Sequence, residues 1–313
     1  MIEVRDLTKD YGSRRAINKL NFSISKGDVV GFLGPNGAGK STTMKIITGF
    51  MAPSQGSASV AGFDVFENPL EVKKRIGYLP ETPPVYGDMY VRDYLRYVAA
   101  LKKVPHDKIE KCVDYAIEKT NLGDVQKRLI QHLSKGFKQR VGIAQAIVSE
   151  PEVLILDEPT VGLDPKQVAE IRDLVKSLKG HHTIILSTHI LPEVEATCEK
   201  VIIINKGQIV AEDSIHNLST MEKGQSRIHV RLRKEITDMK SILSDISQVV
   251  SVHLGATSKE WDIDVQGGEE VVDMISSRIV NKGFGLIELS PSKLDLEDVF
   301  LKLTYGAEGK EGN

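Results

Sequence analysis

The chain has 313 residues, of which 41% are hydrophobic and 27% charged, a composition typical of a globular protein with a sizeable core. This length favours two domains. The formal net charge of −2 excludes a strong electrostatic attraction to nucleic acid or to an anionic membrane surface.

The sequence shows no membrane-spanning or exported segment. No stretch approaches the ~20 consecutive apolar residues of a membrane helix, and the first residues, Met1 to Asp6, lack the apolar core of a signal peptide. Cys112 and Cys198 have no metal-binding spacing. We therefore expect free thiols in a reducing cytoplasm, and any role at a membrane would come through a partner.

The first elements are predicted strands. Residues 2–7 alternate and predict an edge strand, and residues 10–12 predict a turn with an exposed tyrosine. Residues 20–25 alternate again. The apolar run Val29–Leu33 then predicts a buried strand, and a helical pattern begins near Gly39. A loop therefore connects this strand directly to a helix.

That loop reads G-x-x-x-x-G-K-S, the phosphate-binding motif. Glycine permits positive φ and a close approach of the backbone, so successive N–H groups form an anion-binding nest at a helix N-terminus. Lys40 is placed to reach the β- and γ-phosphates, and the Ser41 hydroxyl to bind Mg²⁺. A glycine-rich turn with a chance lysine would not explain the flanking strand and helix. The candidate nucleotide-binding residues of this loop are Gly34, Pro35, Asn36, Gly37, Ala38, Gly39, Lys40, Ser41 and Thr42.

Helical periodicity dominates residues 88–148. From Ile109, apolar residues recur at i, i+3, i+4, i+7 and i+8, which places Cys112 on a core face rather than in a site. Short strands are predicted before this segment, at residues 56–61 and 75–81. The pattern predicts a helical insertion inside an α/β fold.

A second buried strand ends in acidic residues. Val153–Leu156 is a continuous aliphatic run, typical of a strand buried on both faces of a parallel sheet. Asp157 and Glu158 follow at its carboxyl end, where open α/β sheets bind their ligands. A helix over 165–179 and a strand over 183–187 complete a strand–helix–strand repeat.

The histidines near this repeat differ in context. His189 follows the strand closely, at the edge of the sheet that carries the acidic pair. His181 and His182 lie in a loop with no other ligand residues nearby, which favours a solvated turn.

A different pattern follows a polar linker near residues 222–226. Residues 227–305 predict the order βαββαβ, a split-βαβ, ferredoxin-like unit, with an added amphipathic helix near 296–303. The tail, 306–313, is predicted to be disordered.

Taken together and in this order, these motifs resemble the nucleotide-binding subunit of an ABC transporter over residues 1 to about 220. The resemblance implies a P-loop NTPase core of the α/β class with an antiparallel β edge and a helical subdomain at about 88–148, an ATP-binding domain over 1–222, and a small C-terminal α+β domain. It also implies that the chain is an ATPase with ATP and Mg²⁺ as cofactors.

The resemblance assigns roles to individual residues. Tyr11 would stack on adenine, although a surface tyrosine in a turn explains it as well. Asp157 would hold Mg²⁺ through water, and Glu158 would be the general base, a role worth roughly 10²–10⁴ in rate. The alternative, a pair of buried structural carboxylates, would be expensive without a cation to share. His189 would contact the γ-phosphate, and Gly162–Asp164 matches a loop that communicates between two subunits.

Leu133–Phe137 takes the place of the family signature L-S-G-G-Q. Ser134 and Gly136 are retained, whereas Lys135 and Phe137 depart from the pattern. In ABC proteins this segment binds the γ-phosphate of ATP held by the opposite subunit, through a serine hydroxyl and a helix N-terminus. The resemblance therefore implies a dimer of two copies. Lys135 either adds a phosphate contact or points to solvent.

Glu81 stands where most relatives carry glutamine. Its carboxylate would still bind Mg²⁺, but it adds negative charge near the triphosphate unless a cation, such as Lys135 across the dimer, compensates it. The segment that follows, Thr82–Tyr90, matches the region where the family meets its membrane subunit. Tyr86 and Tyr90 suit a docking surface, and a rigid surface loop explains them too.

The ending Leu296–Phe300 resembles the appended domain of ABC-2-type exporter ATPases of gliding-motility, multidrug, sodium-efflux and copper-maturation systems. The implied partners are a second copy and separately encoded ABC-2-type transmembrane permease subunits, at the cytoplasmic face of the membrane, in export or membrane remodelling. The appended domain has an alternative role, as an addition that stabilises the dimer.

Two other classes of function were weighed. A soluble ABC-type ATPase acting on ribosomes or DNA is disfavoured by the single phosphate loop, by the absence of long coiled coils and zinc motifs, and by the near-neutral charge. An ATP-binding regulator without hydrolysis is opposed by Glu158 and His189, which are both in place. No nucleic-acid partner is expected.

Overall fold

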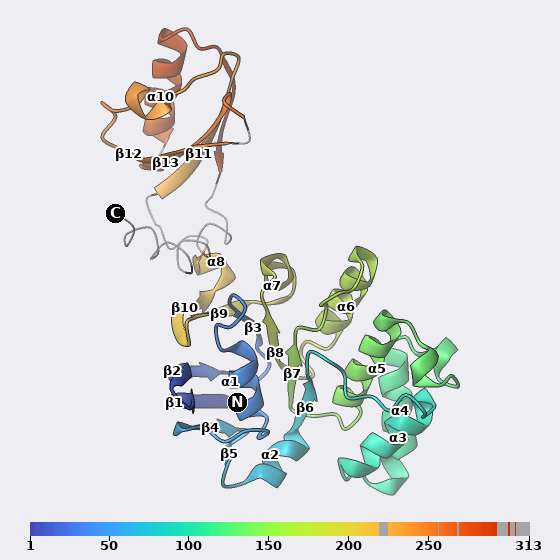
Figure 1. Ribbon diagram of the computed structural model, residues 1–313. Coiled ribbons are helices and arrows are strands. Elements are labelled where there is room, and N and C mark those ends of the chain that lie inside the picture. Colours follow the sequence, from blue (N-terminus) through green and yellow to red (C-terminus); the bar gives the residue numbers. More distant parts are fainter. Residues whose placement is uncertain (219–224, 256, 268, 293–299, 301–303, 305–313) are drawn as a thin grey trace. The chain divides into compact units, whose positions relative to one another are not determined.

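The computed structural model describes residues 1–218, 225–255, 257–267, 269–292, 300 and 304. These residues form two compact units, Met1–Ile215 and His216–Gly306, each with its own hydrophobic core (Figure 1). The expected domain boundary near 222, most of the predicted helix at 296–303 and the tail 306–313 lie outside the described residues. No helix in the described part of the chain is long and apolar enough to span a membrane.

A mostly parallel sheet forms the centre of the first unit. Its strands are β3 (Val29–Leu33), β6 (Ile76–Leu79), β7 (Val153–Asp157), β8 (Thr183–Thr188), β9 (Lys200–Asn205) and β10 (Gln208–Ser214). The six strands lie in the order β10-β9-β3-β8-β7-β6, and only β10 pairs antiparallel to its neighbour. Every residue of β3 and of β7 is buried, which confirms both predicted buried strands.

A second sheet is antiparallel and contains the N-terminus. Its strands are β1 (Ile2–Tyr11), β2 (Arg14–Ile24), β4 (Gln55–Val60) and β5 (Phe63–Asp64), in the order β2-β1-β4-β5. Because β1 pairs with both β2 and β4, the prediction of an edge strand over residues 2–7 is wrong. The strand also runs through part of the predicted turn. Its register shifts near Asp6, which has a φ of 46°, and this irregularity interrupts the alternation that ended the prediction at residue 7.

Helices cover the parallel sheet and form a separate cluster. The helices of the first unit are α1 (Lys40–Ile47), α2 (Pro69–Arg75), α3 (Val91–Leu101), α4 (Ile109–Lys119), α5 (Lys135–Ile147), α6 (Pro165–Ser177) and α7 (Leu191–Thr197), and α8 (Ile215–Leu218) follows at the junction of the units. Helices α3, α4 and α5 pack on one another, which confirms the helical segment (Figure 1). Cys112 is a buried free thiol on α4, as predicted.

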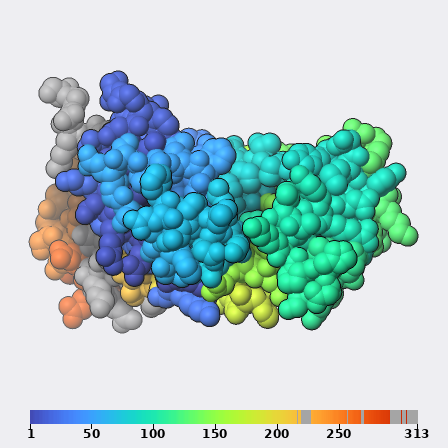
Figure 2. All heavy atoms as spheres, turned by 90° about the horizontal axis from the view of Figure 1, so that it is seen from below, coloured from blue at the N-terminus to red at the C-terminus, as the bar shows by residue number. Residues whose placement is uncertain are grey.

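Figure 2 shows the helical segment, in green tones, directly beside the light-blue region around α2. The end of α3 is tied to this region by Lys102, whose Nζ donates to the carbonyl oxygens of Lys73 at 2.9 Å and of Ile76 at 2.8 Å. The helical segment and the nucleotide-binding core are therefore joined through hydrogen bonds as well as through chain connections.

The second unit has the predicted ferredoxin-like order. Its elements are β11 (Gln225–Leu232), α9 (Met239–Ile242), β12 (Val249–Leu254), β13 (Glu260–Gln266), α10 (Glu269–Asn281) and β14 (Leu286–Ser292). All neighbouring strands are antiparallel, in the order β12-β13-β11-β14. Because β13 lies between β11 and β12, these strands form a split βαβ unit. The first helix is shorter than the sequence pattern indicates.

His182 corrects one prediction. His181 is exposed, but His182 is only 4% exposed, and its Nδ1 lies 2.6 Å from the carbonyl oxygen of Pro151. Burial lowers the pKa of His182. A solvated turn is therefore wrong for His182, which instead fastens the start of β8 to the residues before β7.

Candidate nucleotide site

The loop between β3 and α1 is built at glycines that have no room for a side chain. A Cβ on Gly34 would stand 2.3 Å from the carbonyl oxygen of Ile204, on β9. A Cβ on Gly39 would stand 2.7 Å from Ile17, and the φ of 111° at Gly39 also favours glycine. Gly39 caps α1 without a side-chain hydrogen bond, so the cap provides no competing acceptor for an anion at this helix N-terminus.

Lys40 is folded back over this loop. Its side chain is almost fully buried, and its Nζ donates to the carbonyl oxygen of Gly34 at 2.8 Å and of Pro35 at 3.4 Å. The same ammonium lies 3.4 Å from Oε1 of Glu158. The ammonium therefore has three oxygen partners within the protein.

Asp157 ends β7 beside the first turn of α1. It is 2% exposed and accepts hydrogen bonds from Ser187 at 2.8 Å and from Ser41 at 3.4 Å. Burial raises the pKa of Asp157, the two serine hydrogen bonds oppose that shift, and the charges of Glu158 and Glu81 add to it. The site is therefore electronegative enough to favour a cation.

The chemistry of these oxygen donors suits Mg²⁺, which takes one or two carboxylates and keeps water and phosphate ligands. A hydroxyl from Ser41 and a carboxylate from Asp157 are already adjacent, and Glu81 lines the neighbouring cavity. The described residues contain no cluster of three or more His, Cys, Asp or Glu side chains arranged for a metal. A magnesium ion held here would thus depend on the nucleotide for part of its coordination.

Glu158 and His189 are hydrogen-bonded partners. Nδ1 of His189 lies 3.0 Å and 3.1 Å from the two carboxylate oxygens of Glu158. Glu158 is 6% exposed and has a φ of 50°, the left-handed region that a non-glycine residue adopts at an energetic cost. Its backbone is held there by a hydrogen bond from its N–H to the carbonyl oxygen of Ser187 at 2.8 Å.

A cavity of about 640 Å³ joins these groups, and this volume lies within the range of small-molecule sites. Its lining residues are Tyr11, Arg14, Ala16, Asn36, Gly37, Gly39, Lys40, Ser41, Thr42, Glu81, Glu158, Val161 and His189. Predicted residues from the N-terminal strand, the phosphate loop and the ends of β6, β7 and β8 therefore meet at one place.

Sequence reasoning missed Arg14, Ala16 and Val161. Arg14 pairs directly with Tyr11 across the turn between β1 and β2. A prediction of this hairpin from the sequence would therefore have placed Arg14 beside the tyrosine. Tyr11 is 46% exposed, and its hydroxyl donates to the sulfur of Met51 at 3.0 Å.

Comparison with known proteins decides the family. The ABC transporter family matches residues 17–161. The bacitracin transport ATP-binding protein BcrA of Bacillus licheniformis is 34% identical over 308 residues, 98% of each chain. The lantibiotic transport ATP-binding protein SrtF of Streptococcus pyogenes is 37% identical over 224 residues, which are 71% of this chain and 95% of SrtF.

The chain belongs to the ABC transporter ATP-binding family. A solved ATP-binding subunit of an ABC transporter superposes with a TM-score of 0.65 at 31% identity, over 71% of this chain and 93% of that one. The predicted family, fold and ATPase class are thereby confirmed, whereas the roles of individual residues stay predictions.

The signature segment of this ABC ATPase lies outside the cavity. Ser134 caps α5 and accepts a hydrogen bond from the N–H of Phe137 at 3.4 Å. The exposed side chain of Lys135 packs on Gly162, because a Cβ on Gly162 would stand 2.0 Å from Nζ of Lys135. The structure thus places Lys135 against the loop Gly162–Asp164 of the same chain, and it does not bring Lys135 to the cavity that Glu81 lines.

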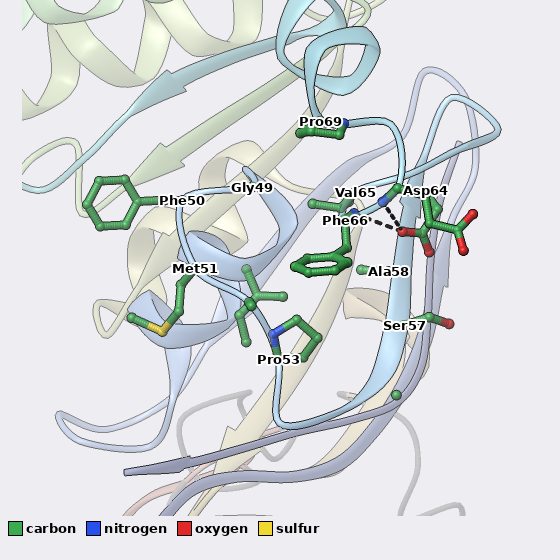
Figure 3. Close-up of a pocket in the computed structure, with 14 residues that line it drawn as sticks. Gly49, Phe50, Met51, Pro53, Ser57, Ala58, Asp64, Val65, Phe66 and Pro69 are labelled. Carbon is green, nitrogen blue, oxygen red and sulfur yellow. Dashed lines mark hydrogen bonds between the residues drawn. The ribbon is translucent and has the colours of Figure 1, made fainter.

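The first unit of the ABC ATPase has other hollows, and two of them have exposed aromatic side chains in their lining. One, of about 490 Å³, lies at the C-terminal end of α1 and is flanked by Phe50, which is 75% exposed, and Phe66, which is 71% exposed. Figure 3 shows the Phe50 ring pointing away from the other labelled side chains, and Phe66 held through its N–H by Asp64. The other, a groove of about 440 Å³, lies between α2 and the helical segment.

Proposed function

We propose that this ABC ATPase binds and hydrolyses MgATP as a dimer and thereby drives export or membrane remodelling by separate transmembrane subunits. The observation that carries the proposal is the ion pair of Lys40 with Glu158 together with the hydrogen bonds between Glu158 and His189, inside one cavity and with the signature segment outside it. We propose that this cavity provides the groups for hydrolysis, except for those that a signature segment would supply.

The positions of these residues support separate binding sites for the adenine, the phosphates and the magnesium ion of MgATP. Tyr11 would stack on the adenine, and residues 34–42 would hold the phosphates at the N-terminus of α1. Ser41, Asp157 and Glu81 would hold Mg²⁺, which supplies charge neutralisation on the phosphate oxygens when bound. The other proposed roles, in proton transfer and in completing the site across a dimer, belong to protein side chains.

Glu158 is proposed to take the proton of the attacking water. It is buried beside a histidine that orients its carboxylate, and a base in this position contributes roughly 10²–10⁴ in rate. Nζ of Lys40 lies 3.4 Å from Oε1 of Glu158. Phosphate oxygens are stronger acceptors for an ammonium than backbone carbonyls, so bound ATP would draw Lys40 away and free the base.

The second half of the site is proposed to come from another copy. Ser134, Lys135 and Gly136 lie at the start of α5, a 13-residue helix, outside their own chain's cavity. Because the side chain of Lys135 lies beside Gly162, we propose that the signature segment and the loop Gly162–Asp164 approach the second copy's nucleotide together.

The groove of about 440 Å³ supports a membrane-subunit partner. Tyr86 lies in it and packs on Tyr94 and Tyr97 with ring centroids 5.9 Å apart in both pairs. Exposed apolar surface is provided by Leu70 and Leu101, and such patches mark protein interaction sites. We propose that an ABC-2-type permease subunit docks there, which would hold this ATPase at the cytoplasmic face of the membrane.

The names of the relatives support transport: BcrA is named for bacitracin transport and SrtF for lantibiotic transport. We also propose that the first unit, with the residues up to about 222, is the ATP-binding domain. The second unit is proposed to be an accessory domain of the same ATPase.

The test is ATP-dependent dimerisation of a base variant. Glu158→Gln is expected to keep MgATP binding, to lower turnover at least about tenfold and to accumulate as a dimer, measured by size-exclusion chromatography with light scattering. Adding Ser134→Arg should return it to a monomer, because the signature contact is lost. Glu152→Gln, on an exposed glutamate before β7, is the control and should behave as wild type. Wild-type turnover in Glu158→Gln would overturn the assignment of the base.

A further inference from the structure

Glu193 is a buried carboxylate that the nucleotide site does not use. It lies on α7, is 3% exposed and is absent from the lining of the nucleotide cavity. One carboxylate oxygen accepts a hydrogen bond from the hydroxyl of Thr160, and the other accepts one from the hydroxyl of Thr188 at 3.0 Å. A buried charge is costly unless it is hydrogen-bonded, and here both oxygens have a buried donor.

The two donors lie next to the proposed catalytic pair. Thr160 follows Glu158 by two residues, and Thr188 directly precedes His189. Glu193 therefore bridges the segment that carries the base and the segment that carries the histidine. The Glu158–His189 hydrogen bonds join the same two segments from the side of the cavity.

Strand alternation explains how one segment is held from both sides. Successive side chains of a strand point to opposite faces. At the end of β8, Ser187 donates to Asp157, whereas Thr188 points the other way and donates to Glu193. The hydroxyl of Thr188 also accepts a hydrogen bond from the N–H of Ile190 at 3.1 Å, which fixes its direction.

Helix α7 is itself closely seated on the central sheet. A Cβ on Gly31 of β3 would stand 2.5 Å from Cγ1 of Val194, the residue after Glu193. Strand β3 leads directly into the phosphate loop, and Figure 1 shows α7 beside β3 and β8. The helix that carries Glu193 is therefore seated on the strand that leads into the proposed phosphate loop.

We propose that Glu193 is a positioning residue that holds Glu158 and His189 in register with each other and with the phosphate loop. The inference rests on the proposed roles of those two residues. Hydroxyl-to-carboxylate hydrogen bonds are among the stronger ones in proteins, and a displacement of about 1 Å at a catalytic group can cost about 10²-fold in rate. The backbone of Glu158 has a strained φ, so it depends on such restraints.

The experiment compares variants of the full chain in steady-state ATPase assays. Glu193→Gln and Thr160→Val are each expected to lower kcat about tenfold, the effect of one lost hydrogen bond of ~1.4 kcal/mol, with KM for ATP changed less than about twofold. Thr160→Ser keeps the hydroxyl and should retain wild-type kcat. Glu195→Gln, on an exposed position of the same helix, is the matched control and should also retain it.

A mutant cycle separates positioning from general destabilisation. In a background that carries both Glu158→Gln and His189→Ala, measured by single turnover, adding Glu193→Gln should lower the residual rate less than about twofold, because both side chains that Glu193 positions are already lost. An undiminished tenfold effect in that background would overturn the proposal, as would a raised KM with unchanged kcat.

If Glu193→Gln fails to fold, the Thr160→Val and Thr160→Ser pair decides by the same criteria. Equal turnover in Thr160→Val and in wild type would refute the positioning role. Failure of the proposed function gives a different result, since Glu158→Gln and His189→Ala would then hydrolyse ATP at the wild-type rate.

Discussion

The buried ion pair between Lys40 and Glu158 predicts how much variants at these two positions lower the free energy of unfolding, measured without nucleotide. The charged atoms are 3.4 Å apart, and the side chains are 6% and 7% exposed. At an effective dielectric constant of about 20, this separation corresponds to about 5 kcal/mol of attraction. Desolvation of the two groups offsets much of it, so the informative quantity is the cost of removing one partner only.

Removal of one partner from a buried pair costs about 3–5 kcal/mol, because an unpaired charge is left behind. We expect Lys40→Ala to lower the free energy of unfolding by about 3 kcal/mol, at the lower end of that range, since His189 remains beside Glu158. The double variant Lys40→Ala with Glu158→Gln no longer buries that charge. It should be more stable than Lys40→Ala by at least about 1 kcal/mol.

The chain offers a matched pair for comparison. Nε of Arg75 and Oε1 of Glu152 are also 3.4 Å apart, but these side chains are 27% and 47% exposed. Exposed pairs contribute about 0.2–1 kcal/mol, so Glu152→Gln should change the stability by less than about 1 kcal/mol. Arg75 also keeps its pair with Glu71 at 2.8 Å, so this variant leaves no buried unpaired charge.

Urea unfolding without nucleotide, followed by circular dichroism, measures these differences. Trp261, the single tryptophan, lies in the second unit, and its fluorescence provides an internal reference. The reasoning is refuted if the double variant is no more stable than Lys40→Ala, because the buried unpaired carboxylate would then not be the source of the loss.

Three further predictions concern other residues. Tyr11→Ala should weaken ATP binding by about 1–3 kcal/mol, the value of one base–aromatic stack, whereas Tyr11→Phe should bind normally; calorimetry decides. Burial raises the pKa of Asp157, so this carboxyl destabilises the fold as pH rises through its folded pKa. Asp157→Asn should therefore raise the thermal midpoint of the metal-free protein at neutral pH but not in acid. Burial also acts to raise the pKa of Asp264, but hydrogen bonding, chiefly from Arg227, holds that pKa below the ordinary value. Asp264→Asn should therefore lower the free energy of unfolding at neutral pH, measured through the fluorescence of Trp261. This loss should vanish as pH falls through the folded pKa of Asp264.

Much of the site was predictable because its residues lie in local motifs. The phosphate loop depends on glycine spacing between a strand and a helix, and Gly34 and Gly39 do stand where a Cβ has no room. Asp157 ends a strand that is buried at every position, as an unbroken aliphatic run predicts. The antiparallel order of the second unit likewise follows from the sequence of strand and helix periods.

The missed features depend on contacts that the sequence pattern does not contain. The irregular register near Asp6 hides a strand that pairs on both sides. Helix α2 has only seven residues and buries one side chain, Val72, so no helical period is visible. His182 is polar in sequence but buried by a contact with Pro151, 31 residues away. The bridge from Glu193 to Thr160 spans 33 residues and carries no local signature.

The ion pair of Lys40 also connects the proposed phosphate-binding group to the proposed base. Oε1 of Glu158 lies 3.4 Å from Lys40, and both of its carboxylate oxygens lie within 3.1 Å of His189. A carboxylate engaged in this way is a poor acceptor for the proton of water. Charged phosphate oxygens accept stronger hydrogen bonds from the ammonium of Lys40 than the neutral backbone carbonyl oxygens beside it do. The lysine that is proposed to bind the phosphates is thus also paired with the proposed base, so we expect Lys40→Ala to abolish ATP binding and to leave Glu158 with His189 as its remaining partner.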